Sequence, residues 1–243
     1  MGHNRSILRI TGADRRGFLQ GLVTNAVPEA PGSLAYAALL TPQGKYLADF
    51  FLWAEDEALF LDADRDQAPD LLKRLSLYKL RSKVAIEVTG ITAVRGTGPV
   101  PEGAMTDPRH PSLGWRLYGA DAKDDTDWDA LRVAHCIPEA GRELIPEETY
   151  ILEAGFERLN GVDFKKGCYV GQEVTARMKH RTTLRKGLTT VTVEGDAPIG
   201  TPIDADGKAA GVLYTQSGGR GIAYLRFDRA TGAMAAGNAR VTR

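Results

Sequence analysis

The sequence has few of the residues that mark secreted and membrane proteins. It contains two cysteines in 243 residues, too few for the disulfide framework of a small secreted protein. No apolar run approaches the roughly 18 residues of a membrane span, and residues 1–10 have no apolar core of the signal-peptide type. These absences predict a cytoplasmic protein with no membrane partner.

An excess of charge of one sign is also lacking. Thirty-one basic residues balance thirty-one acidic ones, so the sequence does not indicate a globally basic nucleic-acid-binding protein. The four histidines show neither HxH nor HExxH spacing, and Cys136 and Cys168 form no CxxC motif. We therefore expect no metal site and no direct binding to nucleic acid.

The N-terminal part alternates strand-like and helix-like segments. Residues 34–40 and 46–53 predict two strands, joined by a turn in which Pro42 and Gly44 supply the turn chemistry. Leucines at helical spacing predict a helix over residues 69–80. A hydrophobic fraction of 43% is enough for a sizeable core, so we expect an α+β body.

The middle and the end of the chain differ from this pattern. Residues 96–114 hold four prolines and few large apolar side chains, which predicts a loop, and the aspartate-rich run 121–129 predicts a solvated loop. Ten glycines in the last 57 residues, between short strand-like runs, predict a small β-barrel or sandwich. We therefore divide the chain into domains of residues 1–183 and 184–243.

The densest group of chemically unusual residues lies between 160 and 177. Gly167 and Gly171 flank Cys168, and apolar residues spaced by four predict a helix that begins at this cysteine. A thiol near a helix N-terminus, with Lys166 close by, is expected to have a lowered pKa and thiolate character. Cys168 and Lys166 are therefore the candidate catalytic residues.

Two features of this region allow more than one interpretation. Residues 163–186 contain seven lysines and arginines against two acids, which suits an anionic ligand but is also typical of a solvated helix face. Cys168 is either a nucleophile or a structural thiol, whereas Cys136 lies among apolar residues and is interpreted as a small buried hydrophobe.

Residues 166–173 read KGCYVGQE and resemble the K-G-C-[FY]-x-G-Q-E signature of the YgfZ family. Further matches follow in order from about residue 8 to 187, including the turn 40–45 and the segment Asp107–Pro108–Arg109. The family consists of folate-binding proteins of iron-sulfur cluster assembly and repair. Its fold is similar to that of the aminomethyltransferase, or T-protein, of the glycine cleavage system.

The resemblance implies a T-protein-like folate-binding α+β body with a small C-terminal β-barrel domain. It implies an accessory protein that binds tetrahydrofolate or a one-carbon derivative and supports iron-sulfur enzymes, with assembly factors or client enzymes as partners. Cys168 would attack a one-carbon or sulfur species, or transiently ligate cluster iron together with a partner's ligands. The cofactor-binding residues that it implies are Asp49, Gly167, Tyr169, Gly171, Gln172, Glu173 and Arg177.

Two other functions stay open at this point. One is a folate-dependent aminomethyl or methyl transferase, although the Asp–Asp pair of the T-protein reads Ala48–Asp49 here. The other is an RNA-associated factor, since relatives of the family are connected with tRNA modification; the neutral net charge argues against direct RNA binding. The resemblance leaves open whether the protein turns over a substrate.

Overall fold

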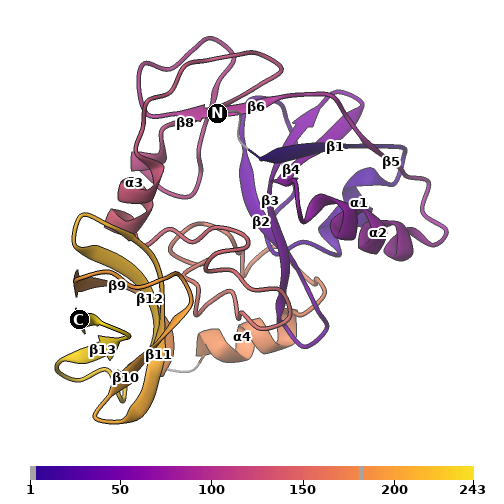
Figure 1. The fold of residues 1–243 in the computed structure, drawn as a ribbon. Coiled ribbons are helices and arrows are strands. Elements are labelled where there is room, and N and C mark those ends of the chain that lie inside the picture. Colours follow the sequence, from indigo (N-terminus) through magenta and orange to yellow (C-terminus); the bar gives the residue numbers. More distant parts are fainter. Residues whose placement is uncertain (1–3, 181–182) are drawn as a thin grey trace.

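A computed structural model of the chain describes residues 4–180 and 183–243. Its first layer is an antiparallel five-stranded sheet with the strand order β2-β3-β4-β1-β5, drawn in indigo and violet in Figure 1. The strands are β1 (Arg5–Thr11), β2 (Ala35–Leu40), β3 (Tyr46–Glu55), β4 (Ala58–Asp64) and β5 (Ala85–Val88).

The predicted hairpin is formed by β2 and β3, which pair with Ala35 opposite Leu52. Its turn is closed by the amide of Thr41, which donates to the carbonyl of Lys45 at 2.8 Å. Gly44 takes the left-handed conformation in this turn (φ 76°), which suits glycine because it has no Cβ. The hairpin predicted from the sequence is therefore confirmed.

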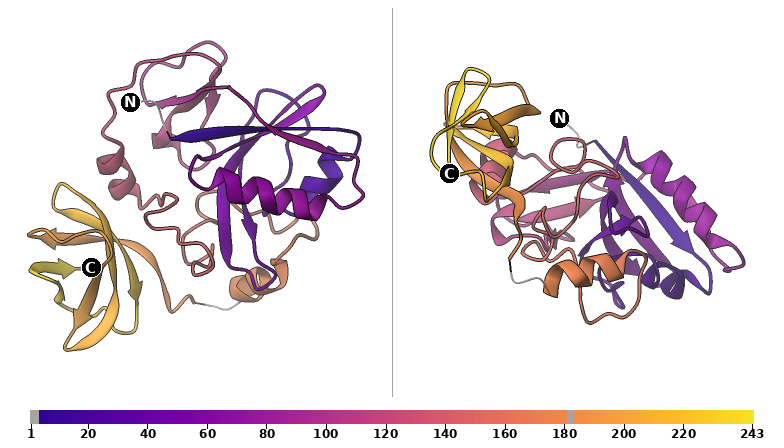
Figure 2. Two further views of the ribbon diagram at one scale, coloured as in Figure 1. Left: turned by 45° about the vertical axis from the view of Figure 1, so that its right-hand side comes forward. Right: turned by 90° about the horizontal axis from the view of Figure 1, so that it is seen from below.

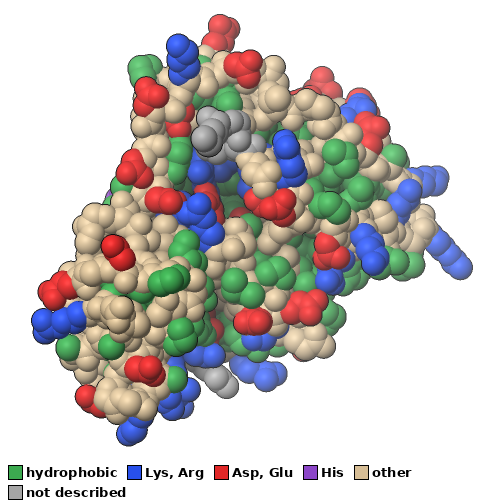
Figure 3. Space-filling view, in the orientation of Figure 1, with side chains coloured by type: hydrophobic (Ala, Val, Ile, Leu, Met, Phe, Trp, Pro, Cys, Tyr) green, Lys and Arg blue, Asp and Glu red, His purple; other side chains and the backbone are tan. Residues whose placement is uncertain are grey.

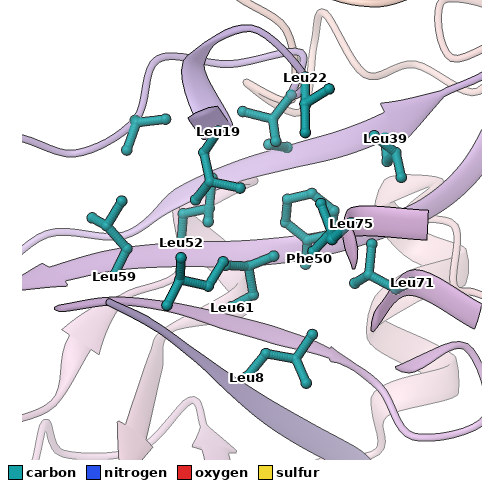
Figure 4. Close-up of a cluster of buried hydrophobic side chains, with 14 of the residues drawn as sticks. Leu8, Leu19, Leu22, Leu39, Phe50, Leu52, Leu59, Leu61, Leu71 and Leu75 are labelled. Carbon is teal, nitrogen blue, oxygen red and sulfur yellow. The ribbon is translucent and has the colours of Figure 1, made fainter. Parts of the chain in front are cut away.

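Two helices cover one face of the sheet: α1 (Arg15–Gln20) and α2 (Ala68–Lys79), the latter close to the predicted helix 69–80. Leu19 of α1 and Leu71 and Leu75 of α2 pack against the strands in the core drawn in Figure 4. Side chains of β2 alternate between the two faces, as expected for a strand buried on both sides. The helices therefore seal one face and leave the other for a second layer.

The second layer consists of a small sheet, short helices and irregular segments. The sheet has the order β6-β8-β7. Its elements and those that follow are β6 (Ala93–Gly96), β7 (Met105–Thr106), the 3-10 helix η1 (Pro111–Leu113), β8 (Trp115–Tyr118), α3 (Trp128–His135) and α4 (Gln172–His180). The predicted loop over residues 96–114 is therefore interrupted by a two-residue strand and a single 3-10 turn.

The rest of the chain forms a closed β-barrel with the order β10-β11-β12-β9-β14-β13. Its strands are β9 (Lys186–Glu194), β10 (Thr201–Ala205), β11 (Lys208–Ser217), β12 (Arg220–Arg226), β13 (Met234–Ala236) and β14 (Ala239–Thr242). Helix α3 packs on this barrel, which lies at one side of the body in both views of Figure 2.

The α+β body with a C-terminal barrel is thus confirmed, whereas the division between residues 183 and 184 stays a prediction. Among the helices of the described residues, none combines the length and the apolar character that a membrane crossing requires.

Candidate functional site

Cys168 lies in an irregular loop, with its side chain exposed. The expectation that it starts a helix is wrong, because α4 begins at Gln172. The reason is the backbone of Gly171, whose left-handed conformation (φ 84°) cannot continue a right-handed helix towards the cysteine. Gly167, on the other side of the thiol, is also left-handed (φ 98°). The two glycines therefore hold Cys168 on a tight, solvent-facing loop.

Lys166 anchors this loop to the end of α1. Its Nζ donates to the carbonyls of Gln20 at 2.7 Å and Val23 at 2.5 Å. The Gln20 side chain donates in return to the carbonyl of Lys166 at 3.3 Å. Burial lowers the pKa of the Lys166 ammonium to about 8, although the negative charge of Asp163 raises it. The ammonium is thus directed at α1, and its catalytic role stays a prediction.

Tyr169 and Gly171 fix the other side of the loop. The Tyr169 side chain is 7% exposed and belongs to the core on the second face of the sheet. A Cβ at Gly171 would lie 2.6 Å from the carbonyl oxygen of Thr41, and a Cβ at Gly44 would lie 2.8 Å from the Cβ of Val174. The absence of side chains at these glycines therefore lets the β2–β3 turn pack closely on α4.

The next residues of the motif lie on α4. Glu173 and Arg177 are exposed, and Gln172 is partly exposed. Six predicted cofactor-binding residues lie outside the wall of the polar cavity described below: Gly167, Tyr169, Gly171, Gln172, Glu173 and Arg177. Their assignment to a cofactor stays a prediction, and the structure gives several of them a part in holding the Cys168 loop.

A polar cavity of about 130 Å³ lies on the face of β3 opposite the helices. Phe51 of β3 forms part of its wall. Among the predicted cofactor-binding residues, Asp49 is the one that reaches it. The charged residues that line the cavity are Arg5, Asp49, Asp64, Arg95, Arg109, Arg116 and Glu139.

Asp49 is buried at 5% exposure and is held by two tyrosine hydroxyls. Tyr36 donates to its Oδ2 at 3.0 Å and Tyr46 to its Oδ1 at 2.6 Å. Burial and the Asp49 charge raise the pKa of both tyrosines well above its usual value, so both remain protonated donors. Each carboxylate oxygen has a second lone pair, so Asp49 can still accept a hydrogen bond from a ligand.

Two buried aspartates fix the arginines of the cavity. Asp62 accepts from Arg5 Nε at 2.5 Å and Arg116 Nη1 at 2.9 Å, and Asp107 accepts from Arg116 Nε at 3.1 Å and Arg109 Nη2 at 2.8 Å. Burial alone would raise the pKa of both carboxyls, but the guanidinium charges outweigh it and lower both values. The arginines are therefore preorganised without any ligand.

Arg95 and Glu139 form a further ion pair on the cavity wall. Arg95 Nη1 lies 2.9 Å from Glu139 Oε1, and its guanidinium lies 3.9 Å from the centre of the Trp128 ring. Burial lowers the pKa of Arg95 to about 10. Burial opposes the ionised form of Glu139, but Arg132 and Arg95 lower its pKa to about 2. Within residues 4–180 and 183–243, the Nε of Arg95 is buried without a hydrogen-bond partner.

The sequence analysis identified Asp49 and missed the arginines of the cavity. A usable signal was present, because Arg116 stands between Trp115 and Leu117 in a short apolar strand. A charge at such a position is usually buried together with a partner. The segment Asp107–Pro108–Arg109 contributed to the family resemblance, yet it was not interpreted as part of a site.

Residues 185–243 match the family described as "CAF17, C-terminal beta-barrel domain". The "Iron-sulfur cluster assembly factor IBA57, mitochondrial" of Mus musculus is 32% identical, over 95% of this chain and 78% of its own length; the Homo sapiens protein of the same name gives the same values. The glycine cleavage system aminomethyltransferase T from Bartonella henselae superposes with a TM-score of 0.75 at 13% identity, covering 98% of this chain and 82% of its own.

These findings confirm the predicted T-protein-like fold and correct one prediction. The predicted cytoplasmic location is contradicted, because the similar assembly factors are named as mitochondrial. That prediction depended on the lack of apolar segments, which distinguishes secreted and membrane proteins from others but does not distinguish one aqueous compartment from another. The narrower assignment to the YgfZ type stays a prediction. The identity and coverage of the relatives show that this chain belongs to the IBA57 family of iron-sulfur cluster assembly factors.

Proposed function

We propose that this protein takes part in iron-sulfur cluster assembly and binds tetrahydrofolate or a one-carbon derivative in the polar cavity. The thiol of Cys168 would act on clusters or on their precursors. The role in assembly follows from the names of its relatives. The observation that carries the folate proposal is a buried aspartate at a preorganised polar cavity of a T-protein-like fold.

The chemistry of the cavity fits a pterin ring. The amino and ring N–H groups of a reduced pterin are hydrogen-bond donors, and Asp49 is an acceptor with free lone pairs. The flat guanidinium of Arg116, which stacks on Phe51 at 3.6 Å from the ring centre, supplies a surface for stacking. A cavity of about 130 Å³ is smaller than a typical small-molecule site, so it would accept the ring and leave the rest of the folate outside. When bound, the folate would supply a one-carbon carrier.

Cys168 would act at a separate place on the surface. Its loop is fixed by Lys166 and Gly171, and its side chain is exposed, which suits contact with a second protein. Iron-sulfur clusters are typically held by four cysteine thiolates. A single thiolate supplies one of these, so the other ligands would come from a client or another assembly factor.

Calorimetric titration with tetrahydrofolate tests the folate proposal. We expect saturable binding by the wild type and by Cys168→Ala, and a loss of at least tenfold in affinity for Asp49→Asn. Glu173→Gln is the matched control, because Glu173 belongs to the predicted cofactor set but lies on α4 outside the cavity wall. Loss of binding in Glu173→Gln with full binding in Asp49→Asn would move the site to the motif and contradict the proposal.

Activity of a client iron-sulfur enzyme tests the role of Cys168. In cells that depend on this protein, Cys168→Ser should fail to restore client activity although it still binds tetrahydrofolate. Cys136→Ser is the control, because burial raises the pKa of that thiol to about 11 and keeps it protonated. Full restoration by Cys168→Ser would exclude a chemical role for the exposed thiol.

The second candidate function is a folate-dependent one-carbon transferase. It is favoured because Asp49 lies on the side of β3 that faces the cavity. Ala48 packs in the core on the helix side, so the residue that replaces the first member of the T-protein's Asp–Asp pair faces away from the cavity. Asp49, at the second position of the pair, is the residue whose carboxylate reaches the cavity. Transfer of a one-carbon unit abolished by Asp49→Asn, but unchanged in Cys168→Ala, would favour this function over the accessory role.

A further inference from the structure

The polar cavity is adjacent to a wider hollow at the protein surface. This outer hollow has a volume of about 770 Å³ and shares Asn4 and Arg95 with the cavity wall. It is bordered by β6 and by the segment between β8 and α3. Because Arg95 belongs to both walls, a ligand that extends from the cavity past Arg95 would enter the outer hollow.

Arg95 offers unused donors at this passage. Its one hydrogen bond within the described residues runs from Nη1 to Glu139, and its Nε is buried with no partner. The Nε and Nη2 groups form the edge of a guanidinium that binds carboxylates in a bidentate manner. Stacking on Trp128 holds the plane of the guanidinium in place. Arg95 is therefore positioned to bind one carboxylate group of a ligand.

Beyond Arg95 the outer hollow is acidic. Asp121, Asp124 and Asp125 line it, with Lys123 as the one further cation of its lining. Asp124 accepts hydrogen bonds from the hydroxyl of Thr126 and from the indole N–H of Trp128. In Figure 3 acidic side chains are visible at the upper left, over the segment that leads to α3 in Figure 1. The carboxylate that each further glutamate adds to the ligand would meet like charge there.

We propose that the site selects folate with a single glutamate over polyglutamylated folate, with Arg95 binding the first glutamate and the aspartates of the outer hollow repelling further ones. This inference rests on the proposed folate binding. Each added glutamate brings one more negative charge. Exposed charge pairs contribute about 0.2–1 kcal/mol, so each added glutamate weakens binding about 1.4- to fivefold.

The test compares three ligands by calorimetry at low salt: 6-methyltetrahydropterin, tetrahydrofolate monoglutamate and tetrahydrofolate triglutamate. We expect the monoglutamate to bind about two- to twenty-fivefold more tightly than the triglutamate, with the difference largely lost at about 1 M salt because exposed charges are screened. Arg95→Gln should weaken monoglutamate binding about tenfold and weaken binding of the methyltetrahydropterin, which carries no carboxylate, by a clearly smaller factor. Unchanged monoglutamate binding in Arg95→Gln would remove Arg95 from the proposal.

A double variant isolates the acidic lining. Asp121→Asn with Asp125→Asn should bring the triglutamate to the affinity of the monoglutamate. Asp204→Asn with Asp206→Asn, at exposed acids of the barrel, should leave the difference intact. If the wild type bound the triglutamate as tightly as the monoglutamate, or more tightly, the proposed selectivity would be wrong although folate binding itself would be supported. No binding of any of the three ligands would overturn both proposals.

Discussion

The buried aspartate Asp62 is expected to contribute far more to stability than an exposed aspartate with the same ion-pair geometry. Asp62 is fully buried, and its Oδ1 lies 2.5 Å from Arg5 Nε. Asp70 makes an equally short contact of 2.5 Å with Arg74 Nε on the surface of α2, where the Asp70 side chain is 58% exposed. Both contacts join an aspartate to an arginine Nε at the same distance, but Asp62 is buried and also accepts from Arg116. The substitutions Asp62→Asn and Asp70→Asn therefore compare a buried ion-pair cluster with an exposed pair.

The expected loss in the free energy of unfolding depends on the charge that each substitution leaves without a partner. Removing one partner of a buried ion pair costs about 3–5 kcal/mol, because a buried charge loses its compensation. Some compensation remains here, since Arg116 keeps Asp107 and Arg5 keeps the main-chain oxygen of Asp62 at 2.5 Å. We therefore expect a loss of about 3 kcal/mol for Asp62→Asn. For Asp70→Asn we expect about 0.3–0.5 kcal/mol, the usual value for an exposed pair spaced by four residues on a helix.

Urea unfolding followed by tryptophan fluorescence measures the difference. All three tryptophans, Trp53, Trp115 and Trp128, lie in the body and none in the barrel, so the signal reports on the domain that contains the substitutions. The unfolding midpoint should fall markedly for Asp62→Asn and barely for Asp70→Asn, at an unchanged slope against urea. A loss below about 1 kcal/mol for Asp62→Asn would show that its ion pairs only balance the cost of burying their charges.

Three further predictions concern the Cys168 loop and pH. Gly171→Ala should destabilise the body by about 2 kcal/mol or more, measured by the same urea unfolding, because alanine is strained at φ 84° and its Cβ would meet the Thr41 carbonyl. Lys166→Met should speed hydrogen exchange of the amides of residues 165–171 about tenfold or more, since two hydrogen bonds to α1 are lost; unchanged exchange would contradict the anchoring role. The pKa of Glu139 is lowered from 4.5 to about 2, so its contribution of about 3 kcal/mol should be present above pH 4.5 and lost as the pH falls towards 2. Urea unfolding between pH 7 and pH 2.5 should show this loss in the wild type and a smaller one in Glu139→Gln.

Local sequence patterns were sufficient for several elements of this fold. The turn residues between two apolar runs predicted the β2–β3 hairpin, and leucine spacing predicted α2. Glycine-rich, short strand-like runs predicted a small β-barrel or sandwich, and the structure has the barrel. These patterns are readable because each records which side of a single element is buried, and neighbouring residues carry that information. The motif 166–173 could be identified for the same reason, because its residues are contiguous in the sequence.

The site depended on information that no local pattern contains. Arg5 and Asp62 are 57 positions apart and Arg116 and Asp62 are 54 apart, so the ion pairs that shape the cavity leave no periodic trace in the sequence. The start of α4 was misplaced because glycine adopts left-handed and right-handed backbone conformations about equally well, and packing against the β2–β3 turn selects the left-handed one at Gly171. The sequence by itself determined the β2–β3 hairpin, helix α2, the short strands of the C-terminal part and the family motif. Tertiary packing decided that Cys168 faces solvent, that Lys166 points into the body and that Asp49 meets four arginines around one cavity, because long-range contacts and buried charges exist only once the chain has folded.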